Sequence, residues 1–89
     1  DNIHLLLSHN IRRIREAQRI SLRQFSLMTG IDRTYLSGVE NGRRNPTVGT
    51  LEKIASGLGV SMEALFHDPN ANNTNNAVDQ LDQLAVSLW

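Results

Sequence analysis

Three side chains near the middle of the chain, Arg33, Thr34 and Ser37, have the types and the spacing to bind a polar surface. On a helix these positions share one face, because residues three and four apart are neighbours. The guanidinium fork of Arg33 can pair with two adjacent acceptors such as guanine O6 and N7, and the hydroxyls can bond to bases or to phosphates. The alternative interpretation of Arg33 is an exposed arginine that pairs with Asp32 or with a phosphate.

Two short helices joined by a tight turn are predicted to present these side chains. Ser21 and Gln24 have the spacing of a capping box at the start of the first of them. Gly30 ends that helix, because a left-handed C-terminal residue costs least as glycine. Asp32 caps the next helix, which ends at Asn41-Gly42. The apolar side chains that can meet inside the resulting angle are Phe25, Ile31, Leu36 and Val39.

Three further helices are predicted from apolar positions that recur at steps of three and four. The first spans Ile3 to about Arg19 and has the apolar stripe Ile3, Leu7, Ile11 and Ile14. Thr47 caps a fourth helix, after the loop Arg43-Arg44-Asn45-Pro46, with the core stripe Val48, Leu51, Ile54, Ala55 and Leu58. Ser61 caps a short fifth helix that contains Met62, Leu65 and Phe66. The sequence therefore predicts an all-α domain of five helices over about residues 3–67.

The last part of the chain has a different composition. Residues 68–76 are rich in asparagine and have little to bury, so we predict a flexible linker. Residues 77–89 repeat apolar side chains at helical spacing, which predicts a short amphipathic helix that is marginal when free in water. This helix can form a dimer contact, pack on its own domain, bind another protein or fray.

Size and composition favour a binding module over an enzyme. A chain of 89 residues is too short for a separate catalytic domain, and the absence of cysteine excludes disulfides and thiolate metal sites. The spacing of His4, His9 and His67 does not indicate a metal site. We expect no catalytic residues, cofactor or metal. With no apolar run of membrane length and no basic start, we expect a cytoplasmic protein without a membrane partner.

Charge is unevenly distributed along the chain, although the net charge is zero. All nine basic residues lie between Arg12 and Lys53, where four acidic residues leave a net charge of +5. Attraction to phosphate decays over roughly 10 Å at ordinary salt. The charge of this segment therefore matters more for nucleic-acid binding than the net charge of the whole chain. The stretch suits nucleic acid, and a solvated basic face is the alternative.

Residues from about Ile11 to Phe66 resemble the lambdoid phage repressor and Cro family, also called the XRE family. The resemblance is strongest in the run from Leu36 to Pro46 and in the segment from Leu51 to Ala55. It implies a five-helix fold, a lambda-repressor-like domain, whose third helix enters the major groove of double-stranded DNA. It also implies a bacterial or phage transcriptional regulator that reads operator DNA as a homodimer. The base contacts it implies are Arg33, Thr34 and Ser37.

The resemblance also implies which residues anchor the DNA backbone and which hold the scaffold. Leu22 stands where the family often has a phosphate-binding glutamine, and small Ser26 stands where the family favours alanine. The alternative role of Tyr35 is packing of its ring against the second helix. Arg15 and Glu40 are expected to pair the first helix with the end of the third. The backbone contacts so implied are Ser21, Leu22, Arg23, Tyr35, Asn41, Arg43, Arg44 and Asn45.

A second function fits the same fold: an antitoxin-like module whose main task is to bind a partner protein. Leu27 and Met28 occupy positions that the family often fills with polar residues, and the predicted tail helix is apolar on one side. Partial burial of Met28 in the core is the ordinary account of that residue.

Overall fold

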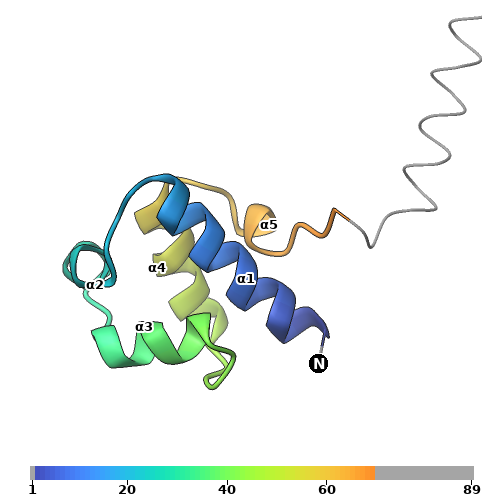
Figure 1. Ribbon diagram of the computed structural model, residues 1–89, viewed down its shortest axis with the longest axis horizontal. Helices are drawn as coiled ribbons and strands as arrows, with labels where there is room; N and C mark the ends of the chain where they lie inside the picture. The colour runs from blue at the N-terminus through green and yellow to red at the C-terminus, as the bar shows by residue number, and fades with distance from the viewer. Residues whose placement is uncertain (1, 70–89) are drawn as a thin grey trace, which may run out of the picture.

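The computed structural model describes residues 2–69, and the secondary structure of this part of the chain consists of α-helices (Figure 1). Helix α1 contacts α3, α4 and α5, while α2 packs on α3 and α4. The predicted five-helix, all-α fold is confirmed. The residues from 70 onward, which include most of the predicted linker and all of the predicted tail helix, lie outside the described residues. The helices are α1 (Asn2–Ala17), α2 (Leu22–Thr29), α3 (Arg33–Glu40), α4 (Val48–Leu58) and α5 (Met62–Leu65).

The helix boundaries follow the capping residues that the sequence predicts. The amide of Gln24 donates to Ser21 Oγ at 3.0 Å, and the amide of Ser21 donates to Gln24 Oε1 at 2.9 Å, which completes the capping box. Gly30 ends α2 with φ of 74°, a left-handed conformation that glycine adopts without steric cost. Asp32 caps α3 by accepting from the amide of Tyr35 at 3.2 Å. These caps fix a short turn and hence the angle between α2 and α3.

Helix α1 ends at Ala17, earlier than the predicted end near Arg19. Arg19 has φ of 59°, and the amide of Ile20 reaches back to the carbonyl of Arg15 at 3.2 Å. The turn is held from outside, because Gln18 Nε2 donates to the carbonyl of Leu58 at 2.7 Å. A contact that is distant in sequence therefore stabilises this turn, and local periodicity does not reveal it.

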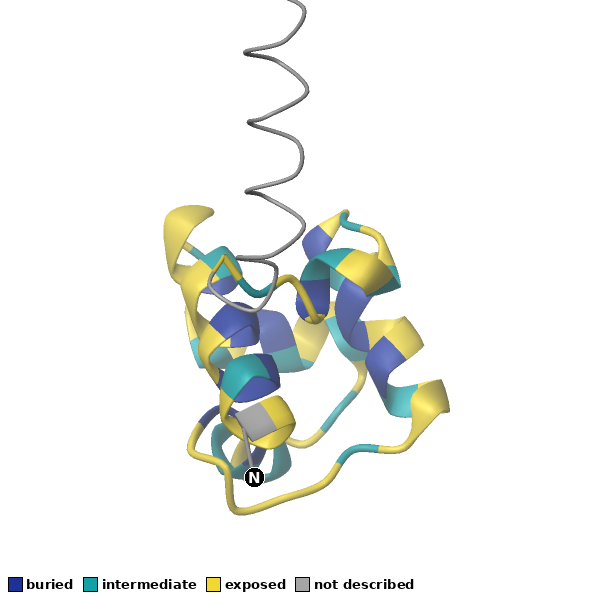
Figure 2. Cartoon of the chain, turned by 90° about the vertical axis from the view of Figure 1, so that its right-hand side faces the viewer, coloured by how far each residue is buried: buried dark blue, intermediate teal, exposed yellow. Residues whose placement is uncertain are grey.

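The core lies between the inward faces of the helices, as the buried residues in Figure 2 show. Three predictions of burial need correction: Ile3 is 56% exposed, Val48 68% and Met28 54%. Ile3 and Val48 lie in the first turns of α1 and α4, so they continue an apolar stripe beyond the depth of the core. Phe66, predicted inside the fifth helix, follows α5 as its C-cap and is 37% exposed. The buried apolar side chains are Leu7, Ile11, Phe25, Leu36, Val39, Leu51, Ile54, Ala55, Leu58 and Leu65.

Two buried polar side chains on α1 fasten it to the other helices. Ser8 Oγ donates to the carbonyl of Val39 at 2.6 Å, and Asn10 Nδ2 donates to the carbonyls of Leu65 at 2.9 Å and His67 at 2.7 Å. Neither role is predicted by the pattern of the sequence. A signal was present, because Asn10 interrupts the apolar face formed by its neighbours along α1. A polar residue on such a face needs a buried partner.

Candidate nucleic-acid interface

The three predicted base-reading residues lie together at the start of α3. Arg33, Thr34 and Ser37 line a surface depression of about 500 Å³, together with residues from the start of α2. The residues that α2 contributes are Ser21, Leu22 and Arg23, which the sequence analysis assigned to the DNA backbone. The turn between the helices thus joins predicted base contacts and predicted backbone contacts in one concave surface.

The N-terminus of α2 offers free backbone donors to this depression. The capping box uses the amides of Ser21 and Gln24, whereas those of Leu22 and Arg23 donate no hydrogen bond within the described part of the chain. Free amides at a helix N-terminus attract anions. The side chain of Leu22 packs against the core, so a phosphate contact at this position would use its backbone amide alone.

Arg33 is exposed and makes no ion pair with Asp32 in the described structure. The carboxylate of Asp32 instead accepts the amide of Tyr35, as a cap of α3. The guanidinium also borders a second depression of about 280 Å³, which Arg23, Ser26 and Leu27 line as well. Arg33 is therefore available to an external acceptor.

Asn41 and Tyr35 are less available than the residues at the start of α3. Asn41 Nδ2 donates to the carbonyl of Ser37 at 2.9 Å and to its hydroxyl at 3.3 Å. The ring of Tyr35 is half-buried against the core, and the guanidinium carbon of Arg44 lies 5.8 Å from its centroid. The loop residues Arg43, Arg44 and Asn45 are all exposed. The structure thus separates the concave surface at the starts of α2 and α3 from a cationic loop at the other end of α3.

Arg15 and Glu40 connect α1 to the end of α3 behind this surface. Arg15 Nε donates to Glu40 Oε2 at 2.7 Å, and Nη2 donates to Oε1 at 2.9 Å. The pKa of Arg15 is raised above its ordinary value, chiefly by the hydrogen bond with Glu40, although burial acts in the opposite direction. These two hydrogen bonds hold the end of α3 against α1.

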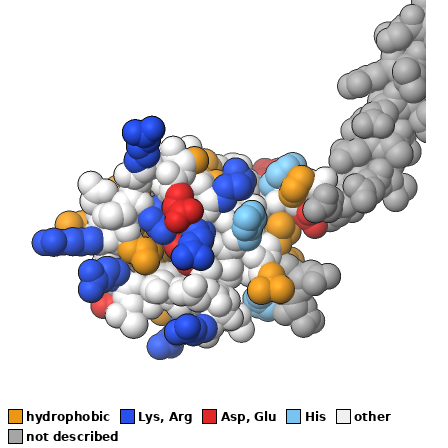
Figure 3. Space-filling model, viewed as in Figure 1, with side chains coloured by type: hydrophobic (Ala, Val, Ile, Leu, Met, Phe, Trp, Pro, Cys, Tyr) orange, Lys and Arg blue, Asp and Glu red, His pale blue; other side chains and the backbone are white. Residues whose placement is uncertain are grey.

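Charged side chains are not spread evenly over the surface. The space-filling view shows lysine and arginine side chains over the region of α1, α2 and α3, and histidines on the side of α5 (Figure 3). This arrangement agrees with the net positive charge of the segment from Arg12 to Lys53. A polyanion would therefore be attracted toward this side of the domain.

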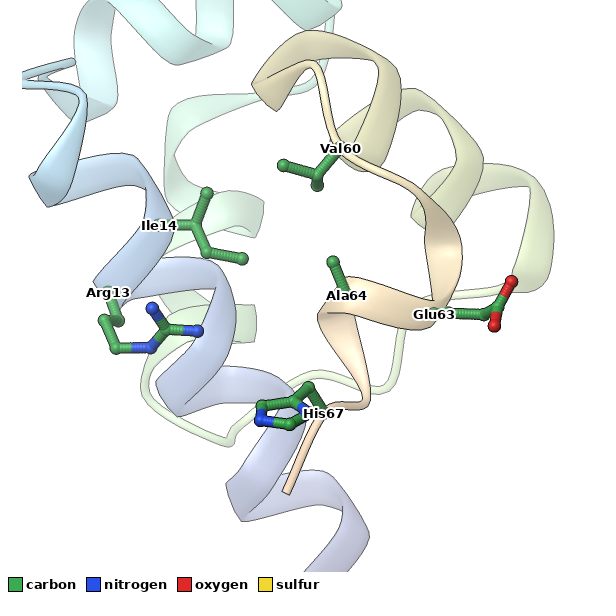
Figure 4. Close-up of a pocket in the computed structure, with 6 residues that line it drawn as sticks. All are labelled: Arg13, Ile14, Val60, Glu63, Ala64 and His67. Atoms are coloured by element: carbon green, nitrogen blue, oxygen red, sulfur yellow. The ribbon is translucent and has the colours of Figure 1, made fainter. Parts of the chain in front are cut away.

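A cavity of about 470 Å³ lies on the other side of the domain, between α1 and the α5 segment (Figure 4). Ile14, Val60 and Ala64 form apolar walls, while Arg13, Glu63 and His67 stand at its edges. Glu63 points away from Arg13 in this view, so these charged groups do not converge. The described residues contain no group of three histidine, cysteine or acidic side chains suited to a metal ion, and no helix among them is long and apolar enough to cross a membrane.

The sequence of residues 11–65 matches the family HTH_3, described as helix-turn-helix. The chain belongs to this helix-turn-helix family. It is 36% identical over 69 residues to the control protein C.MunI from Mycoplasma sp, a match that covers 76% of this chain and 93% of C.MunI. Several relatives are named HTH-type transcriptional regulators. The predicted family and the predicted class of DNA-binding transcription regulator are thus confirmed.

Solved structures of similar proteins share the fold. The restriction-modification controller protein C.AhdI from Aeromonas hydrophila is 31% identical, with a TM-score of 0.68, and the match covers 70% of this chain and 94% of C.AhdI. The controller protein C.Esp1396I, solved as a tetramer in complex with its natural 35 base-pair operator, is 33% identical with a TM-score of 0.69. That match covers 74% of this chain and 87% of C.Esp1396I. The likeness extends over the domain that carries the depression.

Proposed function

We propose that the chain is a sequence-specific transcriptional regulator that places α3 in the major groove of operator DNA. The observation that carries this function is the single depression lined by Arg33, Thr34 and Ser37 of α3 and by the start of α2. A helix of this kind in the groove brings its N-terminal half to the base edges. Because it acts on genomic DNA, we assign the protein to the cytoplasm of a bacterial cell.

The residues take two kinds of role in this proposal. Arg33 pairs with guanine O6 and N7, a contact that discriminates by about 1–3 kcal/mol, and the hydroxyls of Thr34 and Ser37 bond to neighbouring base edges. The free amides of Leu22 and Arg23 bind one phosphate. The remaining backbone anchors are Ser21, Tyr35, Asn41, Arg43, Arg44 and Asn45. These anchors fix the register of the protein on the duplex and carry no sequence information.

We further propose that two copies bind together. A symmetric homodimer would set two α3 helices in successive major grooves about 34 Å apart and would require a palindromic site. The similar protein C.Esp1396I was solved as a tetramer on its operator, which supports an assembly of several copies. Residues 77–89, joined through the linker at residues 68–76, remain a candidate dimer contact.

Selection of bound duplexes from random DNA at near-physiological salt tests the function and the reading surface together. We expect the wild type to enrich a palindrome, and Arg33→Ala to enrich the same palindrome with relaxed preference at one symmetric pair of positions. Failure of the folded wild-type protein to enrich any sequence would reject the proposal. An unchanged preference in Arg33→Ala would remove Arg33 from the base contacts.

A second candidate function, the antitoxin-like binding of a partner protein, is favoured by one observation. Leu27 is 79% exposed and Met28 is 54% exposed, so α2 presents two large apolar side chains to solvent. Adjacent exposed apolar residues are typical of protein-binding surfaces. A regulator can carry both functions, and absence of any enriched DNA sequence would make this one the leading candidate.

A further inference from the structure

Helix α3 contains a glycine, Gly38, in its interior, where glycine stabilises a helix less than any other residue except proline. Its φ is not among the positive values of the chain, which belong to Gly30, Gly42 and Gly59 and to Arg19. The backbone conformation therefore does not require glycine here. Another constraint must account for the missing side chain.

The space that a side chain would occupy is filled by Arg44. A methyl group on Gly38 would lie 2.6 Å from Cγ of Arg44 and 3.6 Å from its Cβ, which is too close for the present arrangement. The loop turns back onto the helix at the same residue, because the amides of Arg43 and Arg44 donate to the carbonyl of Gly38 at 2.7 and 3.2 Å. The stem of Arg44 thus lies directly across α3.

The guanidinium of Arg44 is held above a ring on the same helix. Its central carbon is 5.8 Å from the ring centroid of Tyr35, within the range of a cation–π contact. Tyr35 and Gly38 are three residues apart and share one face of α3. The guanidinium makes no hydrogen bond or ion pair with any other described residue, so all its donors are available. In the described part of the chain, the guanidinium therefore lies over the ring with no hydrogen-bonding partner.

We propose that Gly38 is a positioning residue, whose missing side chain seats Arg44 over Tyr35 so that its guanidinium binds a DNA phosphate beside α3. This inference rests on the proposed DNA-binding function and adds a specific device to it. An exposed arginine on a loop loses much conformational entropy when it binds, and a stem packed on a helix has already lost part of it. Gly38 therefore lowers the stability of the helix and preorganises a phosphate contact.

The decisive variant is Gly38→Ala, because it should lower the affinity for DNA without lowering the stability of the fold. Alanine favours the helix, so the thermal midpoint should rise or stay unchanged, provided that Arg44 moves aside. The affinity for a fluorescein-labelled duplex of mixed sequence should fall about tenfold, as for the loss of one charged hydrogen-bonding contact. The slope of log affinity against log salt should fall by about one.

Gly49→Ala is the matched control. Gly49 is an exposed glycine in the first turn of α4, and a methyl group there would meet only Thr47 Oγ1 at an ordinary 3.9 Å. We expect this variant to favour its helix without changing the affinity for the same duplex. An equal loss of affinity in both variants, or none in Gly38→Ala, would overturn the proposal.

A double-mutant cycle with Arg44→Ala separates the seating of Arg44 from a direct clash between the new methyl group and DNA. Arg44 is exposed, so its truncation should leave the fold intact and lower the affinity as much as Gly38→Ala does. In the Arg44→Ala background, Gly38→Ala should have no further effect. Additive losses would show that Gly38 acts by another route, and wild-type affinity in Arg44→Ala would also overturn the proposal.

The seating itself can be measured without DNA. In the NMR spectrum of the free wild-type protein, the Hδ protons of Arg44 should be shifted upfield by the Tyr35 ring, and Gly38→Ala should abolish that shift. Absence of the shift in the wild type would reject this inference and leave the proposed DNA-binding function standing. Absence of any duplex binding by a wild type that shows the shift rejects the proposed function and the phosphate contact with it.

Discussion

Arg15 and Glu40 lie nearly enclosed between α1 and the end of α3, with side chains 9% and 2% exposed and Nε 2.7 Å from Oε2. A further donor of Arg15, Nη1, bonds to the carbonyl of Ile20 at 2.6 Å. The pair and the carbonyl of Ile20 thus connect three segments, while Arg12 and Glu16 approach these charges only at 4.0 Å. Removing either partner would leave the other without its short hydrogen bonds in a region of low dielectric.

We expect Arg15→Ala to reduce the free energy of unfolding by about 3–5 kcal/mol, because Glu40 would stay buried without its partner. The thermal midpoint, followed by circular dichroism, should fall by well over 10 °C, since about 1 kcal/mol shifts the midpoint of a small domain by 4–8 °C. Arg12→Ala is the control, because Arg12 approaches the same Glu40 at 4.0 Å but has a side chain 53% exposed. It should cost less than about 1 kcal/mol. Equal midpoints for the two variants would contradict this account.

Asn10 should contribute to stability because its side chain connects α1 to two carbonyls of the α5 segment. Asn10→Ala removes the donor to the carbonyls of Leu65 and His67 and should cost about 1–3 kcal/mol in urea unfolding. Asn10→Asp has nearly the same shape but replaces the donor with a carboxylate that faces two carbonyl oxygens, so it should cost more than alanine at neutral pH. If aspartate were tolerated as well as asparagine, the bonds to the α5 segment would contribute little.

Gly57→Ala should destabilise the domain although it lies in the interior of α4. The added methyl group would lie 2.8 Å from Cγ2 of Thr29 and 3.1 Å from Cε1 of buried Phe25. Thr29 cannot easily retreat, because its hydroxyl donates to the carbonyl of Phe25 at 2.8 Å. Overpacking costs about 1–3 kcal/mol, which exceeds the helix-propensity gain of about 1 kcal/mol.

Thr29→Ser tests this explanation, because serine keeps the hydroxyl and lacks the methyl group that Gly57→Ala would meet. In urea unfolding, the double variant should be more stable than the sum of the two single changes predicts. If the two changes in the free energy of unfolding were strictly additive, the strain would not arise at the methyl group of Thr29, and the contact with Phe25 would account for it.

The sequence predicts the helix starts well because caps are local. Ser21 and Gln24, or Asp32 and the amide of Tyr35, interact across three residues, so the pattern contains the whole interaction. Prediction from the sequence fails where a contact with a distant segment determines the local structure. The turn after α1 is stabilised by the carbonyl of Leu58. Ile3 and Val48 are exposed because the core does not extend to the first turns of their helices. Periodicity gives the direction of a side chain and not its depth.

The candidate site shows the same division. The outward face with Arg33, Thr34 and Ser37 follows from helical spacing, and the structure places these residues in one depression. The relation between Gly38 and Arg44 is not visible in the sequence, because it depends on the loop turning back onto α3. The internal bonds from Asn41 to Ser37 are equally hidden, although they are four residues apart, because an exposed asparagine has many possible partners.

Arg43 offers a test of the proposed distinction between contacts to the DNA backbone and contacts to base edges. It is exposed, and only its backbone amide is engaged, at 2.7 Å from the carbonyl of Gly38. Arg43→Ala should weaken binding to all duplexes by a similar factor and lower the salt slope by about one, as expected for the loss of one phosphate contact. Fluorescence anisotropy with a selected palindrome and a scrambled duplex, each at several salt concentrations, measures both effects.

Arg13→Ala is the control for this titration. Arg13 carries the same charge but borders the cavity between α1 and the α5 segment, which shares no lining residue with the depression on α2 and α3. If net charge alone governed binding, both variants would lower the salt slope equally. If the cationic loop contacts the duplex, only Arg43→Ala changes the slope, and the ratio of affinities for the two duplexes stays that of the wild type. A change in that ratio would instead place Arg43 on a base edge.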